Sequence, residues 1–324
     1  MPAAQRLPAS TTYRNPVVAA DCPDPTILRT GDWWWTATTS GDRADAFPVR
    51  RSTDLVTWVD AGFIFPSHRR PAWIASACWA PELGMVDGGY ACWYTARDHG
   101  GRLCVGVATS DHPAGPWRDR GEPLIRTADV GQIDPAFFRD ADGKTYLYWK
   151  EDGNDLRPCR PTALYGQAIA GDGVTLLGER RTLMINDLAW EGDLVEGPGL
   201  IARDGWYWMF YSGNAFYDGR YATGVARARH PLGPFEKRGD PILVSSDRWL
   251  GPGHGVPFAI GDEHWFLYHA WRGVADFKKH GRQLLLDRIV WGPDGWPGFA
   301  GGVPSSDVRA APLADRGDAV RRSA

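Results

Sequence analysis

The chain has 324 residues, 43% of them hydrophobic, and a formal net charge of −3 at pH 7. This length suits one large domain or two ordinary ones. The charge includes no basic block, so nucleic-acid binding and binding to an anionic membrane are both disfavoured. The 17 Trp, 39 Gly and 25 Pro are typical of a turn-rich, all-β protein.

The N-terminal segment and the cysteines bear on location and redox state. Residues 1–16 contain no apolar run of the kind that an export signal needs, and no segment approaches 18 consecutive apolar residues. We therefore expect a cytoplasmic protein without a membrane span, although a trimmed secreted chain would look the same. The number of cysteines is odd and no two form a CxxC pair, so we expect reduced, mostly buried thiols rather than a zinc site or a disulfide framework. They are Cys22, Cys78, Cys92, Cys104 and Cys159.

Five aromatic clusters follow one another along the chain, each after a turn signal rich in Gly and Asp. They begin at Trp33, Tyr90, Tyr146, Trp206 and Trp265, in steps of 57, 56, 60 and 59 residues. A fixed long period is the mark of a repeat architecture. Each cluster is preceded by a short segment with Pro or Gly beside a polar residue, and is followed by a strand of small and β-branched residues and a short final strand.

These repeats predict an all-β fold, a single-domain five-bladed β-propeller. Three to four strands in each unit suit a blade, and Gly and Pro interrupt every window in which an amphipathic helix could form. We place the propeller at residues 15–300, an N-terminal arm at 1–14 and a C-terminal tail at 301–324. Either arm could supply a strand that closes the ring.

The short segment before each aromatic strand carries one polar residue, and these five residues form the second register of the repeat. They are Asp24, Glu82, Asp134, Glu196 and His254. The first strand of a propeller blade lines the central channel, so we expect these side chains to converge.

Any one of these acids could simply be a turn residue, because Asp-Pro and Glu-Gly-Pro are common in turns. Three acids at one phase, Asp24, Asp134 and Glu196, favour catalysis instead. Like charges held close together raise one another's pKa, which leaves a protonated acid beside an ionised base. Glycoside hydrolysis needs such a pair.

The motifs around these residues resemble glycoside hydrolase family 43, the five-bladed propeller arabinofuranosidases, xylosidases and arabinanases. They are PDPTIL at 23–28, WAPEL at 79–83, IDPAFF at 133–138, VEGPGL at 195–200 and GPGHGVPF at 251–258. The resemblance runs from about Asn15 to Pro297. It implies that Asp24 is the general base, Glu196 the general acid and Asp134 the residue that modulates the pKa of the acid. It also implies inversion at the anomeric carbon, with the base and the acid roughly 6.5–9.5 Å apart.

The resemblance suggests further site residues. His254 matches a family histidine beside a central calcium or sodium ion, and a hydrogen-bonding core histidine is the alternative because hard cations prefer oxygen ligands. Arg282 matches an arginine that contacts the sugar, with an ordinary strand-end surface residue as the alternative. No organic cofactor is expected.

Aromatic and acidic residues near these motifs are candidates for binding the substrate. Trp79 and Trp35 could form walls of the pocket or belong to the core, and Glu82 could bind sugar hydroxyls or cap its turn. His269 is expected to be structural. Gly199 stands where relatives often carry Trp, which leaves the identity of the sugar open.

The expected function is an inverting glycoside hydrolase, exo-acting on terminal α-L-arabinofuranosyl units of oligosaccharides from arabinan or arabinoxylan. A β-xylosidase and an endo-arabinanase are the alternatives within the family, and a non-catalytic carbohydrate-binding propeller is the alternative outside the enzymes. The expected partner is an oligosaccharide, and the sequence does not indicate an oligomeric state.

Overall fold

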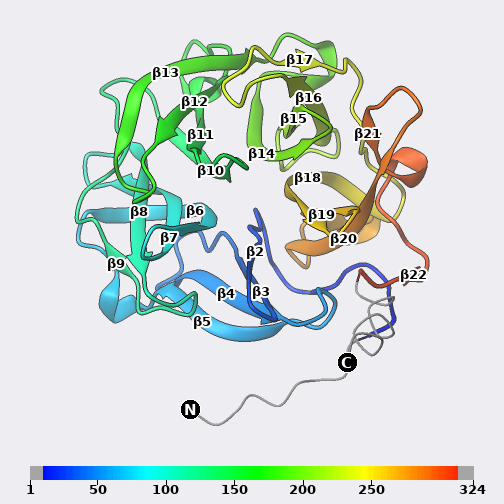
Figure 1. Cartoon of the computed structure of the whole chain (residues 1–324), viewed down its shortest axis with the longest axis horizontal. Coiled ribbons are helices and arrows are strands. Elements are labelled where there is room, and N and C mark those ends of the chain that lie inside the picture. Colours follow the sequence, from blue (N-terminus) through cyan, green and yellow to red (C-terminus); the bar gives the residue numbers. More distant parts are fainter. Residues whose placement is uncertain (1–9, 313–324) are drawn as a thin grey trace.

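The computed structural model describes residues 10–312 and contains five antiparallel sheets of four strands each. The sheets stand around a common axis, with the first strand of each sheet innermost (Figure 1). Within each sheet the strands follow one another in chain order. The predicted all-β, five-bladed propeller is therefore confirmed.

Each blade corresponds to one repeat of the sequence. Blade one contains β2 (Leu28–Thr30), β3 (Trp33–Ala37), β4 (Ala46–Ser52) and β5 (Val59–Phe65). Blade two contains β6 (Ile74–Val86), β7 (Gly89–Asp98), β8 (Leu103–Ser110) and β9 (Arg118–Asp119). Blade three contains β10 (Gln132–Arg139), β11 (Thr145–Glu151), β12 (Ala163–Ile169) and β13 (Leu176–Ile185). Blade four contains β14 (Val195–Arg203), β15 (Trp206–Gly213), β16 (Ala222–Ala228) and β17 (Glu236–Lys237). Blade five contains β18 (Trp249–Ile260), β19 (Glu263–Arg272), β20 (Arg282–Trp291) and β21 (Pro297–Gly298).

The aromatic clusters form the second strand of every blade and are buried between neighbouring sheets. Trp93 on β7 stacks on Phe137 of β10 in the next blade, with ring centroids 4.4 Å apart and planes 16° apart. Phe210 on β15 and Phe266 on β19 make the corresponding contact between blades four and five, at 5.3 Å. Large aromatic rings contribute most to the burial of apolar surface. Their period therefore records the packing of blade against blade.

The segments that enter blades one, three and five also pair with the third strand of the blade before them. Isolated bridges join Ile125 to Val105 of β8 and Leu243 to Thr223 of β16. The same bridge joins Val18, which precedes blade one, to Leu284 of β20 in blade five. The ring thus closes through backbone hydrogen bonds between residues 17–22 and β20, including one from Cys22 N to Arg282 O at 2.7 Å.

The described parts of the two arms pair with each other rather than with a blade. β1 (Thr12–Tyr13) and β22 (Arg309–Ala310) form a separate two-stranded sheet. Next to it, the buried Asn15 side chain accepts a hydrogen bond from Leu286 N and donates to Leu286 O, at 2.9 and 3.1 Å. Residues 1–9 of the predicted arm (1–14) and residues 313–324 of the predicted tail (301–324) lie outside the described residues.

The remaining elements of the described chain are short. Five 3-10 turns of three residues occur: η1 (Ser67–Arg69), η2 (Gly153–Asp155), η3 (Ala189–Glu191), η4 (Val274–Asp276) and η5 (Ala300–Gly302). None of these helical turns could span a membrane. The cysteines are unpaired thiols, four of them buried and Cys159 exposed.

Replacement of Asn15 by Ala tests the closure of the ring. The change removes the hydrogen bonds to the backbone of Leu286 in a buried site, so we expect the free energy of unfolding to fall by about 1–3 kcal/mol. Urea denaturation followed by tryptophan fluorescence measures this change. Gln167→Ala on β12, which removes one exposed hydrogen bond, is the control and should change stability by less than about 0.5 kcal/mol. Equal losses in the two variants would contradict the role of Asn15.

Candidate active site

The innermost strands are distorted where they carry polar residues. In β10 the register with β11 shifts between Ile133 and Ala136, and in β14 the register with β15 shifts between Glu196 and Gly199. At this point of the five blades the backbone has a positive φ, between 41° and 57°, at Asp24, Ala80, Asp134, Gly197 and His254. Non-glycine residues adopt this region only when the surroundings enforce it, and a β-bulge redirects a side chain. The distortions therefore turn selected side chains toward the axis.

This register corrects one expectation from the sequence. In blade two the position with positive φ is occupied by Ala80, and Glu82 lies two residues further along β6. Glu82 is buried and accepts a hydrogen bond from Phe137 N at 3.3 Å. It lines a second cavity further along the channel, which shares Asp24 and His254 with the cavity that holds all three catalytic candidates. Burial raises the pKa of Glu82 to about 7.

Each of four strained residues is tethered to the blade before it by its own N–H group. The acceptors are His269 Nδ1 for Asp24, Thr39 Oγ1 for Ala80, Thr95 Oγ1 for Asp134 and Ser212 Oγ for His254, at 2.6–3.1 Å. Thr95, Ser212 and His269 each follow an aromatic residue of a second strand. A buried N–H group needs such a partner, so these side chains support the distorted strand ends.

Blade three departs from this pattern. The residue that follows the aromatic cluster on β11 is Lys150, which cannot accept a hydrogen bond. Gly197 N donates to Asp134 Oδ2 instead, at 3.2 Å. The Lys150 ammonium is thereby available to contact Glu196 Oε2 at 2.9 Å and Asp152 Oδ1 at 3.0 Å.

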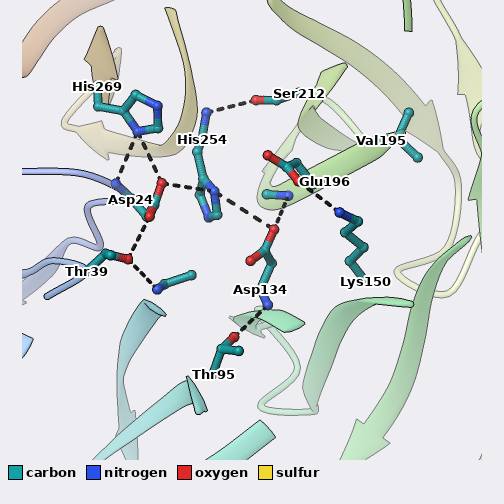
Figure 2. A network of polar contacts seen from close by, with 12 residues as sticks. Asp24, Thr39, Thr95, Asp134, Lys150, Val195, Glu196, Ser212, His254 and His269 are labelled. Carbon is teal, nitrogen blue, oxygen red and sulfur yellow. Dashed lines mark hydrogen bonds and ion pairs between the residues drawn. The ribbon is translucent and has the colours of Figure 1, made fainter. Parts of the chain in front are cut away.

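The three predicted catalytic acids come together in one cavity of about 310 Å³, which Lys150, His254 and Arg282 also line. Their exposed fractions are small: 6% for Asp24, 5% for Asp134 and 8% for Glu196. Figure 2 shows His254 between Asp24 on one side and Asp134 with Glu196 on the other. Carboxyl groups from blades one, three and four therefore share a site although they are far apart in the sequence.

Asp24 is held as a carboxylate. Its Oδ1 accepts a hydrogen bond from Arg282 Nη1 at 2.8 Å, and its Oδ2 accepts one from Thr39 Oγ1 at 2.6 Å. Burial alone would raise the pKa of Asp24, but the Arg282 guanidinium and His254 hold it well below its usual range. Burial lowers the pKa of His269 to about 4, so that its neutral ring accepts the Asp24 N–H. Arg282 therefore contacts a catalytic candidate and is not an ordinary surface residue.

Asp134 and Glu196 have opposite electrostatic environments. Burial and the nearby Glu196 carboxylate raise the pKa of Asp134. Burial also acts to raise the pKa of Glu196, but the Lys150 ammonium outweighs it and lowers that pKa. Tyr221 Oη donates to Glu196 Oε1 at 2.8 Å. These environments favour a proton on Asp134 over a proton on Glu196.

His254 contacts the carboxyl groups rather than a cage of oxygen donors. Its Nδ1 lies 3.3 Å from Asp24 Oδ1 and 3.9 Å from Asp134 Oδ2. Among the described residues, one group with metal-ligating atoms includes it, together with Asp134 and Glu196, within 4.8 Å of one another. Calcium prefers six to eight oxygen ligands, and both oxygens of Glu196 already accept hydrogen bonds. This donor set does not fit calcium. The ion expected beside His254 stays a prediction, and no step below depends on it.

The aromatic candidates separate into a core residue and a cavity residue. Trp35 is 2% exposed and packs in the core of blades one and two. Trp79 lines the cavity, as do Phe216 and Tyr217 from the loop after β15. Phe216 and Tyr217 are 39% and 56% exposed, and their rings meet edge to face at 5.3 Å. Arg282 lies over the Phe216 ring at 4.5 Å. These two rings form an exposed aromatic rim that the repeat pattern did not indicate.

The sequence did not identify three further residues of the site, which are Lys150, Asp152 and Tyr221. A signal for Lys150 existed, because it stands at the phase where the other aromatic strands have Thr95, Ser212 and His269. Its position two residues beyond the buried Tyr148 places it on an apolar face, where a charge is unusual.

Comparisons with known proteins match nearly the whole chain. The profile of Glycosyl hydrolases family 43 matches residues 13–297. A crystal structure of a thermostable family-43 glycoside hydrolase superposes with a TM-score of 0.85 at 30% identity, and the match covers 93% of this chain and 99% of that chain.

Curated relatives extend the comparison to named activities. The β-D-galactofuranosidase xynD of Aspergillus niger is 29% identical, over 90% of this chain and 87% of the relative. The xylosidase/arabinosidase 43B of Humicola insolens is 29% identical, over 87% of this chain and 54% of the relative. The chain spans about half the length of most curated relatives that it matches.

Replacement of Arg282 by Met tests the charge balance at Asp24. Because the folded-state pKa of Asp24 lies below the unfolded value of about 3.9, the pair stabilises the fold fully above that pH and less as the pH falls. We expect a loss of about 3–5 kcal/mol at pH 7, since a buried carboxylate is left without its cation, and a smaller loss at pH 3. Urea unfolding at a series of pH values measures both.

The control is Arg118→Met, which breaks an exposed ion pair with Asp111. It should change stability by less than about 1 kcal/mol at every pH. A loss in Arg282→Met that does not depend on pH would contradict the assignment.

Proposed function

The chain belongs to glycosyl hydrolases family 43, and from this membership we propose that it is an inverting glycosidase that releases terminal pentosyl units, most of all α-L-arabinofuranosyl units. The observation that supports the proposal most strongly is that the surroundings favour opposite protonation states in two parts of the cavity. Arg282 keeps Asp24 ionised, whereas Asp134 and Glu196 retain one proton between them. An ionised base and a protonated acid in one cavity are the requirements for glycoside hydrolysis.

The proposed reaction assigns one role to each carboxyl group. Asp24 takes a proton from water as the water oxygen forms a bond to the anomeric carbon. The bond from that carbon to the leaving oxygen breaks, and its electron pair stays on the oxygen, which receives a proton from Glu196. Asp134 holds the proton of the pair until it is needed. Attack by water on the face opposite the leaving group inverts the anomeric carbon.

Two features support action on a terminal unit. The cavity of about 310 Å³ ends at buried catalytic residues, and Arg282 presents donors for sugar hydroxyls next to the base. Support for the sugar comes from relatives, because one is named for a furanosyl sugar and the other for xylose and arabinose. The second name equally supports a β-xylosidase, which is therefore the second candidate.

A panel of nitrophenyl pentosides with short arabino- and xylo-oligosaccharides tests the function. We expect hydrolysis of α-L-arabinofuranosides with release of one pentose at a time, and a product of inverted configuration in proton NMR. Asp24→Asn and Glu196→Gln should each lower kcat by a factor of about 10²–10⁴, while each variant remains folded by circular dichroism. Preference for β-xylosides would select the second candidate. Sugar binding without hydrolysis would leave a carbohydrate-binding propeller.

The aromatic rim predicts how the leaving part of an oligosaccharide is bound. Sugar C–H faces pack on aromatic rings, so Tyr217→Ala should raise KM for arabinotriose roughly three- to tenfold. Hydrolysis of methyl α-L-arabinofuranoside, which has no second sugar, should change less than about twofold. The control is Phe63→Ala, which removes an exposed ring on the outer strand β5. Equal effects on both substrates would argue against binding at the rim.

A further inference from the structure

Lys150 is a buried cation with two carboxylate partners. Its side chain is 1% exposed, and its ammonium lies 2.9 Å from Glu196 Oε2 and 3.0 Å from Asp152 Oδ1. Burial acts to lower the pKa of Lys150, but the two carboxylates raise it, so the group stays charged. Asp152 and Glu196 approach it from different elements, since Asp152 follows β11 and Glu196 lies on β14.

The hydrogen bonds identify the ionised member of the acid pair without reference to any titration. Both oxygens of Glu196 accept hydrogen bonds, from Tyr221 Oη at 2.8 Å and from Lys150 Nζ. This is the arrangement that suits a carboxylate, because a protonated carboxyl has an O–H donor that needs an acceptor of its own. Asp134 Oδ2 accepts from Gly197 N, and within residues 10–312 no hydrogen bond engages its Oδ1. The hydrogen bonds therefore favour the proton of the pair on Asp134, although the proposed acid is Glu196.

We propose that Lys150 determines which of the two carboxyl groups, Asp134 or Glu196, carries the catalytic proton, and that Asp152 is the second anchor that lets Lys150 release Glu196. While the ammonium contacts Glu196, that carboxylate stays ionised. When the ammonium keeps only Asp152, Glu196 loses the cation that stabilises its negative charge. The O–H bond on Asp134 then breaks and an O–H bond forms on Glu196.

Lys150 acts through Glu196 and is thus a positioning residue. Its position supports this role, because it replaces the Thr, Ser or His that tethers the strained residue of the next blade elsewhere in the ring. The effect of Lys150 on catalysis rests on the proposed function. The position of the proton in the free protein does not depend on that function.

Other charged or titratable groups also face the pair. His254 on β18 lies 3.9 Å from Asp134 Oδ2, and Tyr221 donates to Glu196. Asp24, which is paired with Arg282, lies on the other side of His254 (Figure 2). All of them remain in variants of Lys150 and Asp152. Differences between those variants and the wild type therefore report on the lysine and its anchor.

The test uses two substitutions that act in opposite directions. Without the ammonium, Lys150→Met should raise the proton affinity of Glu196 and move the high-pH limit of kcat/KM upward by about 1–3 pH units. Asp152→Asn removes one of the two carboxylates that contact Lys150, so the ammonium should interact more strongly with Glu196. The high-pH limit of kcat/KM should then move downward. A merely structural lysine would lower activity without moving either limit.

Lys237 offers a matched control. It is a largely buried lysine that contacts two carboxylates, Asp187 at 2.6 Å and Glu191 at 2.7 Å, outside the catalytic cavity. Lys237→Met should lower the melting temperature as Lys150→Met does, with the pH profile of the wild type. Superimposable profiles for Lys150→Met and the wild type, or shifts of the same sign in Lys150→Met and Asp152→Asn, would overturn the proposal.

A measurement without substrate separates this inference from the proposed function. Carbon-13 NMR of the side-chain carboxyl groups in the free protein, assigned with Asp134→Asn and Glu196→Gln, follows each protonation directly. We expect Asp134 to be the member that titrates at higher pH in the wild type, and Glu196 to titrate at higher pH in Lys150→Met than in the wild type. A Glu196 that already carries the proton in the wild type would overturn the inference, even if pentosides are hydrolysed. If no pentoside is hydrolysed, the proposed function fails and these spectra still decide the position of the proton.

Discussion

The structure depends on a hydrogen bond that is repeated around the ring, from a strained inner residue to a side chain of the preceding blade. The positive φ values at Asp24, Asp134 and His254 are unfavourable for residues with a Cβ. Acceptors from the neighbouring blade hold them there, so each blade shapes the inner edge of the next. The same contact that fixes the blades relative to one another therefore directs the candidate catalytic side chains.

A second constraint is the balance of buried charge. Carboxylates of low exposure would repel one another and be poorly solvated unless cations stood nearby. The site has two such cations, with Arg282 on the side of Asp24 and Lys150 on the side of Glu196. This separation divides a single cavity into a half that favours an ionised base and a half that keeps a shared proton. The chemistry follows from where the two cations stand.

Much of the fold and of the site could be predicted because the repeat consists of large aromatic residues and prolines that are easy to recognise in the sequence. The aromatic period predicted the blades, and the Pro that follows Asp24 and Asp134 marked the bulged strand ends. Glu82 was misplaced because bulges add residues unevenly, so equal spacing in the sequence does not give equal positions in the blades.

Trp35 and Trp79 could not be told apart, since their burial depends on packing between blades rather than on neighbours in sequence. Lys150 was overlooked because it directly follows the buried aromatic residues of β11, and only the comparison of equivalent strands reveals it as the exception.

The closure of the ring has a consequence for how the protein is made. The hydrogen bond from Cys22 N to Arg282 O lies two residues from Asp24, and the side chain of the same arginine binds the Asp24 carboxylate. A chain emerging from the ribosome presents Asp24 long before Arg282. The surroundings of Asp24 are thus completed only when the third strand of blade five is in place, so a chain that stops before β20 lacks the guanidinium that holds this carboxylate.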